Sequence, residues 1–240
     1  MIHRPTIVLV NPQMGENIGA AARAMLNFGL CDLRLVNPRD GWPNPRAIDM
    51  SADALDKMPP VQVFETLAEA VADLHVTYAT TARTRDMVKP VYTPRAAALE
   101  THANPNQKTG FVFGAERTGL TNDETALCTH IIQIPTNPDF SSLNLGQAVL
   151  LIAHELFQAS DDTADTVLDM GDSAPATQDE FEHFFGRLEG ALEEHRFFKS
   201  EDLKPTMVRN IRNIFTRSKL STQEVNTLQG ILSALSGKKK

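Results

Sequence analysis

The chain has 240 residues, of which 42% are hydrophobic and 22% are charged. This is an ordinary globular composition with enough apolar residues for one large or two small domains, and it excludes a disordered or fibrous protein. The N-terminal residues lack the apolar core of a signal peptide, and no apolar run is long enough to cross a bilayer. We therefore expect a cytoplasmic protein with no membrane partner. Cys31 and Cys128 have no metal-ligand spacing, and we expect both to be reduced and buried.

Strands alternate with helices through the first two thirds of the chain. The expected strands are Thr6–Val10, Asp32–Val36, Val61–Phe64, Val76–Thr80, Gly110–Gly114 and the run that begins at Ile131. The expected helices are Ile18–Phe28, Leu67–Asp73, Pro94–His102, Asn122–Cys128 and Ala148–Leu156. Residues 39–60 are expected to form a loop with a short helix around Met50–Lys57. This alternation predicts an α/β domain over residues 1–159, with a parallel sheet and helices on both faces.

The composition changes twice after this domain. Residues 160–177 are rich in Asp, Ser, Thr, Ala and Pro, which predicts a flexible acidic linker. Three stretches with apolar residues at helical spacing follow, and they predict a small all-helical extension over residues 178–240. Phe181, Phe184 and Phe185 share one face of its first helix and are expected to form its core.

Charge is distributed unevenly, although the net charge is only −7. Residues 1–154 carry a net charge of −3, residues 155–195 carry −11, and residues 196–240 carry +7. A basic tail after an acidic segment indicates a polyanionic partner such as a nucleic acid. A tail that is merely solvated explains the same charges, so charge alone leaves both interpretations open.

Several familiar sites are excluded by their missing residues. The stretch Gly114–Leu120 has the glycine spacing of a P-loop, but Leu120 stands where the phosphate-binding lysine belongs. No G-x-G-x-x-G motif follows the first strand, so the usual dinucleotide fingerprint is absent. The seven histidines form no ligand cluster, so we expect no metal site. Ser142 lacks the sequence context of a nucleophile elbow.

Three polar loops remain, and each follows a buried strand. The loops cover residues 11–23, 114–119 and 136–146. The polar side chains that they offer are, in chain order, Asn17 and Arg23, then Glu116, then Ser142 and Asn144. Because the carboxyl ends of parallel strands converge on the ligand crevice of an open sheet, we expect these three loops to share one site.

The three loops resemble the three motifs of the SPOUT methyltransferases. The stretch from Asn11 to Ala24, Asn-Pro-x-x-Gly-x-Asn-Ile-Gly-Ala-x-Ala-Arg-Ala, is similar to the first motif. Phe113–Leu120 resembles the second motif, and the run from Ile134 to Gly146, with its Ser-Leu-Asn-Leu-Gly end, resembles the third. The motifs stand in the family's order and spacing. The acidic linker and helical extension are similar to those of the TrmJ-type tRNA 2′-O-methyltransferases.

This resemblance implies a fold, a cofactor and partners. The C-terminal segment of the sheet domain would thread a loop to form a deep trefoil knot, a rare exception among protein folds. The cofactor would be S-adenosyl-L-methionine (SAM), and the protein would be a homodimer with active sites at the subunit interface. The substrate would be tRNA, methylated on the ribose 2′-hydroxyl of the cytidine or uridine at position 32 in the anticodon loop.

The resemblance also implies roles for the site residues. Arg23 is the family's proposed catalytic group, and we expect it to grip the phosphate next to the target ribose, because a guanidinium stays charged and is a poor base. Asn17 and Glu116 would fix Arg23 and the loops, and Ser142 and Asn144 would bind the reacting nucleotide or shape their loop. Positions that match the family's cofactor contacts are Ala79, Thr80, Thr81, Gly114, Ile134, Ser141, Ser142 and Leu143. Glycine at 114 would let the backbone approach the cofactor closely.

Basic side chains for tRNA phosphates are expected in two places. Arg83, Arg85 and Lys89 form a basic loop next to the cofactor positions, and Arg209 and Arg212 lie in the extension. Simple solvation explains these charges equally well.

Other interpretations of the motif residues stay open. Asn17 also fits a helix cap, Glu116 and Arg117 fit a surface pair, and Ser142 and Asn144 fit loop and N-cap positions. Three other functions compete with the tRNA enzyme: a SPOUT 2′-O-methyltransferase acting on ribosomal RNA, a non-catalytic RNA-binding relative, and an α/β enzyme for a small molecule.

Overall fold

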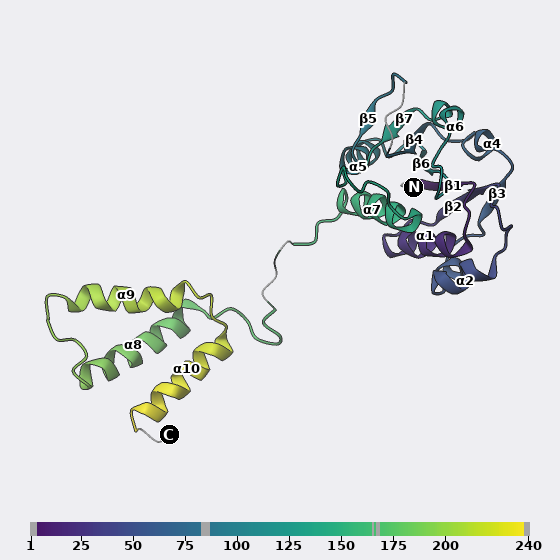
Figure 1. The fold of residues 1–240 in the computed structure, drawn as a ribbon. Coiled ribbons are helices and arrows are strands. Elements are labelled where there is room, and N and C mark those ends of the chain that lie inside the picture. Colours follow the sequence, from purple (N-terminus) through teal and green to yellow (C-terminus); the bar gives the residue numbers. More distant parts are fainter. Residues whose placement is uncertain (1–3, 83–86, 165, 167–168, 238–240) are drawn as a thin grey trace. The chain divides into compact units, whose positions relative to one another are not determined.

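The computed structural model describes residues 4–82, 87–164, 166 and 169–237 (Figure 1). The chain divides into two compact units, Met1–Thr163 and Ala164–Lys240. The first unit contains the predicted α/β domain and the second contains the predicted helical extension.

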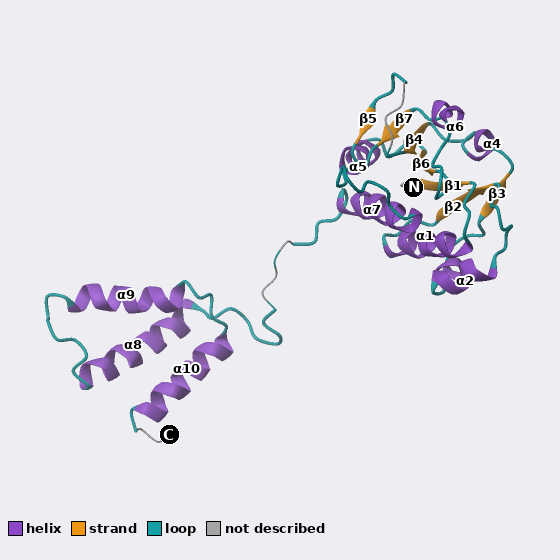
Figure 2. Ribbon diagram, in the orientation of Figure 1, coloured by secondary structure: helices purple, strands orange, loops and turns teal. Residues whose placement is uncertain are grey.

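A parallel sheet of seven strands organises the described part of the first unit (Figure 2). The strands are β1 (Thr6–Val10), β2 (Asp32–Val36), β3 (Gln62–Phe64), β4 (Val76–Thr80), β5 (Val91–Tyr92), β6 (Thr109–Phe113) and β7 (His130–Ile132). Their order across the sheet is β3-β2-β1-β6-β4-β7-β5, and every neighbouring pair is parallel. This order places the carboxyl ends of β1, β6, β4 and β7 side by side, as the sequence predicts. The trefoil knot stays a prediction.

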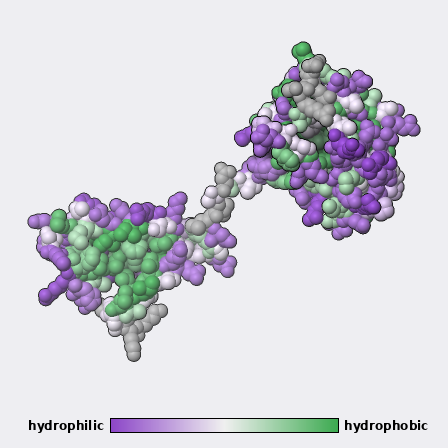
Figure 3. Space-filling model, in the orientation of Figure 1, coloured by the Kyte–Doolittle hydropathy of each residue, from purple (hydrophilic) through white to green (hydrophobic). Residues whose placement is uncertain are grey.

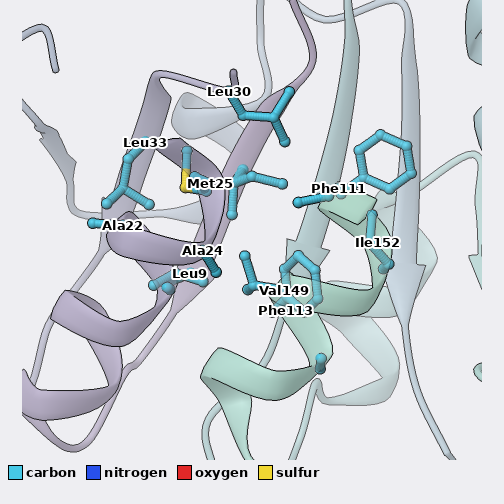
Figure 4. Packing of buried hydrophobic residues seen from close by; sticks show 14 of the residues in the cluster. Leu9, Ala22, Ala24, Met25, Leu30, Leu33, Phe111, Phe113, Val149 and Ile152 are labelled. Carbon is cyan, nitrogen blue, oxygen red and sulfur yellow. The ribbon is translucent and has the colours of Figure 1, made fainter. Parts of the chain in front are cut away.

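Helices cover both faces of the sheet. They are α1 (Gly15–Asn27), α2 (Pro45–Ser51), α3 (Ala54–Lys57), α4 (Leu67–Ala70), α5 (Pro94–Ala103), α6 (Asn122–Leu127) and α7 (Leu145–Gln158). Because successive strand residues point to opposite faces, the central strands β1, β6 and β4 contribute to a core on each face. Leu9 and Phe113 pack with Met25 of α1 and Ile152 of α7 (Figure 4). Val8 and Val112 pack on the other face, against Leu67 and Ala70 of α4 and against Leu120.

Glycines set how closely α1 packs against its neighbours. A Cβ atom at Gly19 would lie 2.2 Å from the carbonyl oxygen of Ala47 in α2, and one at Gly146 of α7 would lie 2.9 Å from the Cβ of Ala20. Both distances are shorter than side chains tolerate, so α1 can lie this close to α2 and α7 only with glycine at these positions.

The structure corrects three secondary-structure predictions. Residues 39–60 contain α2 and α3, because Asn44 accepts hydrogen bonds from the N–H groups of Arg46 and Ala47 and caps α2 ahead of Pro45. The helix predicted to end at Asp73 ends at Ala70, whose carbonyl accepts a hydrogen bond from Arg34. Strand β5, which is not among the predicted strands, exists because its two residues pair with β7.

The described residues of the second unit form three helices: α8 (Gln178–Glu194), α9 (Lys204–Thr216) and α10 (Thr222–Leu235). Phe181, Phe184 and Phe185 form its core with Val225, which confirms the predicted aromatic core. Apolar surface stays uncovered over these helices (Figure 3), which carry exposed residues such as Ile231, 49% exposed.

Part of the predicted linker belongs to this second unit. The N–H of Ala176 donates to the carbonyl of Leu220, and the N–H of Thr222 donates to the carbonyl of Ala174, both at 2.9 Å. Residues 173–177 therefore run beside the start of α10 and leave a connecting segment that is shorter than the predicted 160–177.

Arg34 is a buried cation in β2, next to the edge of the sheet. Only 7% of the residue is exposed, and its guanidinium donates to Asp73 at 2.5 Å, to the carbonyl of Ala70 at 2.7 Å and to Asp32 at 3.2 Å. The hydrogen bond from Arg34 lowers the pKa of Asp73 to about 2. This group of contacts therefore connects β2 to the end of α4.

We expect Asp73→Asn to reduce the free energy of unfolding at pH 7 by about 1 kcal/mol, a modest loss because the Asp73 side chain is 46% exposed. A lowered pKa in the folded state stabilises the protein above the ordinary value of 3.8, and this contribution disappears as the pH falls toward about 2. The difference between variant and wild type should shrink over that range. Urea unfolding followed by fluorescence of Trp42, the single tryptophan, measures it.

Asp49→Asn, at an exposed position on α2, is the matched control and should follow the wild type at every pH. A gap for Asp73→Asn that stays constant from pH 7 to pH 2 would contradict the assigned pKa.

Candidate functional site

A cavity of about 270 Å³ lies at the carboxyl ends of β4, β6 and β7, where open parallel sheets form their ligand crevices. Its lining residues are Thr80, Thr81, Ala82, Phe113, Gly114, Ala115, Glu116, Arg117, Thr118, Gly119, Ile134, Ser141, Ser142, Leu143, Leu145 and Ala148. They come from the ends of three strands, from the second and third polar loops and from the start of α7.

Most of the positions predicted for the cofactor line this cavity. They are Thr80, Thr81, Gly114, Ile134, Ser141, Ser142 and Leu143. Ala79 is the exception: it is fully buried and packs with Val112 on the opposite face of the sheet. Strand alternation could have revealed this difference, since neighbouring residues of β4 point to opposite faces.

Sequence reasoning missed several lining residues. Ala82, Ala115, Arg117, Thr118 and Gly119 flank predicted positions and line the cavity because their loops curve around it. Leu145 and Ala148 belong to the first turns of α7, and the apolar pattern of that helix gave no signal that separates them from core residues.

A chain of hydrogen bonds joins the three polar loops. Glu116, from the second loop, accepts a hydrogen bond from the side-chain amide of Asn17 at 2.7 Å. The carbonyl oxygen of the Asn17 side chain accepts in turn from the amide of Asn144, in the third loop, at 2.9 Å. Asn17 is only 8% exposed, so these bonds are shielded from water. The three loops therefore meet at one edge of the sheet, as predicted.

Glu116 also caps α1 from a distance. Its carboxylate accepts from the backbone N–H of Gln13 at 2.8 Å and from that of Met14 at 3.2 Å. Met14, at the N-cap position of α1, makes no side-chain capping bond. A carboxylate there is favoured by the positive end of the helix dipole. The interpretation of Glu116 and Arg117 as a surface pair is therefore wrong for Glu116.

The sequence allowed a helix-cap role for both Asn17 and Asn144, and the structure shows that role only for Asn144. Asn17 lies inside α1, so its interpretation as a helix cap is wrong. Asn144 is the N-cap of α7, where its side-chain oxygen accepts from the N–H groups of Gly146 at 2.8 Å and Gln147 at 3.4 Å. The same side chain donates to Asn17, so Asn144 both starts α7 and connects it to α1.

Gly114 is required by the chain itself. A Cβ atom at this position would lie 2.1 Å from the carbonyl carbon of Gly119 and 2.2 Å from the nitrogen of Leu120. Gly119 has a positive φ of 67°, and its N–H donates to the carbonyl of Ala115 at 2.7 Å. The loop thus folds back tightly onto Gly114. Close approach of a cofactor, the predicted reason for this glycine, is not needed to explain it.

Arg23 does not line the cavity. It is exposed on α1, six residues after Asn17, which corresponds to about 9 Å along a helix axis. Within the described residues its guanidinium makes no hydrogen bond or ion pair. Ser142 is exposed and lines the cavity together with Ser141 and Leu143. A single chain therefore assembles all the predicted catalytic residues except Arg23.

The predicted RNA-binding residues differ in whether their side chains already bind other groups of the protein. Arg83 and Arg85 lie outside the described residues. Lys89 donates to the carbonyls of Ala126, at 3.0 Å, and Cys128. Arg212 binds Glu182 and Glu189, each at 2.7 Å, and these bonds raise its pKa. Arg209 is exposed and donates to Thr206 at 3.0 Å.

The ammonium group of Lys89 is thus bonded to backbone carbonyls, and the guanidinium of Arg212 is bonded to two glutamates. Both residues have structural roles in this chain. Two other arginines are exposed near the second loop: Arg117, which lines the cavity, and Arg39. The hydrogen bond to Asp40 raises the pKa of Arg39, and the negative charge of Glu116 also contributes.

The described residues include no group of three or more His, Cys, Asp or Glu side chains that could hold a metal ion. No helix in the described ranges is long and apolar enough to cross a bilayer.

The two cysteines are free, with Cys128 buried and Cys31 partly exposed, so the prediction that both are buried is wrong for Cys31. Burial raises the pKa of the Cys128 thiol to about 11.

Comparison with known proteins defines the class to which this fold and site belong. The SpoU rRNA Methylase family matches residues 4–154, and the chain belongs to that family. Residues 179–240 match a second family, described as the C-terminal domain of the tRNA methyltransferase TrmJ.

Individual relatives cover nearly the whole chain. The tRNA (cytidine/uridine-2′-O-)-methyltransferase TrmJ of Salmonella typhimurium is 36% identical over 244 residues, which cover 100% of this chain and 99% of that protein. The crystal structure of TrmJ from Z. mobilis ZM4 is 47% identical, with a TM-score of 0.83, and covers 97% of this chain and 99% of that one.

The fold is also found in a more distant enzyme. The SpoU methyltransferase AviRb from Streptomyces viridochromogenes, in complex with the cofactor AdoMet, is 19% identical, with a TM-score of 0.54, and covers 66% of this chain and 58% of that one. This likeness shows that the two proteins share a fold.

We expect Asn17→Ala to lower the free energy of unfolding by about 1–3 kcal/mol, because it removes two shielded hydrogen bonds and leaves the Asn144 amide without its acceptor. Urea unfolding followed by Trp42 fluorescence provides the measurement. Asn27→Ala, at the exposed last residue of α1, is the control and should cost much less. Equal losses for the two variants would show that the Glu116–Asn17–Asn144 chain contributes nothing to stability.

Proposed function

We propose that this protein transfers a methyl group from SAM to the ribose 2′-hydroxyl of the cytidine or uridine at position 32 in the tRNA anticodon loop, in the cytoplasm. One observation carries the proposal: the hydrogen-bond chain from Glu116 through Asn17 to Asn144 gathers the three methyltransferase motifs beside one cavity. The relatives named as tRNA (cytidine/uridine-2′-O-)-methyltransferases support the substrate class.

The cavity suits SAM in the chemistry of its lining. Phe113, Ile134 and Leu143 offer apolar surface for a purine ring, and the loop Gly114–Gly119 offers backbone polar groups. The hydroxyl oxygen of Thr80 is buried without a hydrogen-bond partner among the described residues, which leaves it available to a ligand. When bound, SAM supplies an electrophilic methyl group on a sulfonium centre.

The protein's own residues mainly position the substrate. Glu116 and Arg117 are the charged residues among the described lining residues, and the carboxylate of Glu116 is already engaged by α1. The lining therefore offers no free general base of the usual kind. Rate enhancement then comes chiefly from holding the 2′-hydroxyl in line with the methyl group. Arg23 contributes by holding the adjacent phosphate, since its guanidinium stays charged.

A homodimer explains why Arg23 is absent from its own cavity. The outer side of α7 exposes Leu150, Leu151 and Phe157 by about 40% each, and Phe28 at the end of α1 packs against Phe157 with ring centroids 5.8 Å apart. Contiguous apolar surface of this kind favours a protein partner. A second copy covering α1 and α7 would bring its Arg23 to the cavity of the first copy.

The second unit supports tRNA as the substrate. It matches the C-terminal domain of a tRNA methyltransferase, and residues 196–240 carry a net charge of +7, which favours a phosphate backbone. In the first unit, Arg117 lines the cavity and Arg39 is exposed, and both can contribute positive charge to RNA binding there. A ribosomal RNA substrate is the alternative that the name of the first family raises.

Radiolabelled methyl transfer to total tRNA and to ribosomal RNA tests the proposed function. We expect label in tRNA only, and mapping of the product should place a 2′-O-methyl group on nucleotide 32. A base-methylated product, label in ribosomal RNA alone, or no product in the presence of SAM would contradict the proposal. Isothermal titration with SAM adds a second readout, because a non-catalytic RNA-binding relative need not bind the cofactor.

Mixing two inactive variants tests the dimer and the role of Arg23 together. Arg23→Ala should abolish methyl transfer and leave SAM affinity nearly unchanged, whereas Ser142→Trp should fill the cavity and abolish both. If Arg23 acts across the interface, one of the two sites in a mixed dimer combines the wild-type Ser142 of one chain with the wild-type Arg23 of the other. Half of the dimers are mixed after random exchange of subunits, so roughly a quarter of the wild-type activity should return. Activity that stays at zero in dimers shown to have exchanged would mean that Arg23 serves its own chain.

A further inference from the structure

Phe140 is the most exposed aromatic residue in the described part of the chain. Its side chain is 78% exposed, compared with 45% for Phe197 and 42% for Phe157. A phenylalanine in such a position forgoes roughly 1.5–3 kcal/mol of burial, so its exposure calls for a specific explanation. The residue lies in the third motif loop, immediately before Ser141 and Ser142 of the cavity lining.

The backbone around Phe140 is held by its own turn. The side-chain oxygen of Asn137 accepts from the N–H of Asp139 at 3.0 Å, and the carbonyl of Asn137 accepts from the N–H of Phe140 at 2.9 Å. Pro135 and Pro138 restrict the same segment further. The exposed ring is therefore carried by a turn that is already formed, one residue before the cavity lining begins at Ser141.

We propose that Phe140 stacks on the base of the nucleotide whose ribose is methylated. The inference rests on the proposed function and adds to it a residue that binds the target base. Single-stranded RNA loops are commonly bound by stacking unpaired bases on aromatic side chains. A ribose held at Ser142 places its own base within reach of Phe140, two residues earlier in the same loop.

Stacking also accounts for the breadth of the substrate class. Every base has a π face, so a stacking contact accepts cytidine and uridine alike, whereas hydrogen bonds to the base edge would distinguish them. Phe140 has no polar atom on its side chain and offers only the stacking contact.

A comparison of two proteins on two substrates tests the proposal. The proteins are the full-length wild type and Phe140→Ala, and the substrates are tRNA with cytidine at the target position and the same tRNA with an abasic ribose there. We expect Phe140→Ala to reduce kcat/KM on the intact tRNA by about 5- to 150-fold, the effect of losing one stacked base. On the abasic tRNA the two proteins should agree within about twofold.

Three further measurements separate stacking from a structural role. Phe140→Trp and Phe140→Tyr should retain most of the wild-type kcat/KM, because both keep an aromatic face. SAM affinity by calorimetry and molecular mass by light scattering should be the same for Phe140→Ala and wild type. Val63→Ala is the matched control, since Val63 is a 49% exposed apolar residue on the edge strand β3, and it should leave kcat/KM unchanged on both substrates.

An equal loss of kcat/KM for Phe140→Ala on intact and abasic tRNA would overturn the proposal. A fall in SAM affinity would also overturn it and would assign Phe140 to the cofactor site. A change in molecular mass would overturn it as well and would assign Phe140 to the dimer contact. A wild type that fails to methylate intact tRNA would instead contradict the proposed function itself. The two failures are therefore distinguishable.

Discussion

The carboxylate of Glu116 is the group on which the geometry of the site depends. It accepts hydrogen bonds from the backbone at Gln13 and Met14 and from the side chain of Asn17, about a hundred positions earlier in the chain. It thereby completes the N-terminus of α1, which has no side-chain cap of its own. Asn17 in turn accepts a hydrogen bond from Asn144, the N-cap of α7. The starts of two core helices are thus fixed by one acidic side chain from a third loop.

Close packing of backbones reinforces this arrangement. Gly19 and Gly146 let α1 approach α2 and α7, and Gly114 lets the second loop fold back against Gly119. Each of these contacts would clash with any larger side chain. The motif glycines therefore determine where the loops lie, and the polar motif residues hold them there. The motifs encode a scaffold as much as a set of ligand contacts, which explains why several of their residues do not reach the cavity.

Local sequence determined most of the fold and much of the site. The alternating strands, the position of the three loops and most of the cavity residues follow from apolar runs that end in polar, glycine-rich segments. What could not be predicted depends on distant partners. The sequence predicts that Lys89 and Arg212 are free to bind RNA. In the structure Lys89 donates hydrogen bonds to backbone carbonyls, and Arg212 forms ion pairs with two glutamates. Strand β5 has only two residues and exists because β7 lies beside it.

The composition of the cavity explains how such a site can work without a conventional acid–base pair. Its lining, as far as the described residues show it, consists mainly of apolar side chains, small hydroxyls and backbone groups, and the carboxylate among them, Glu116, is held by α1. A site of this kind contributes to catalysis by alignment, and alignment requires that the substrate be gripped at several points. In the proposed function Arg23 holds a phosphate and Phe140 stacks on a base, and both residues are exposed in the single chain. On this proposal the second copy and the RNA complete the site together, and the geometry for methyl transfer forms when the ribose, its base and its phosphate are all bound.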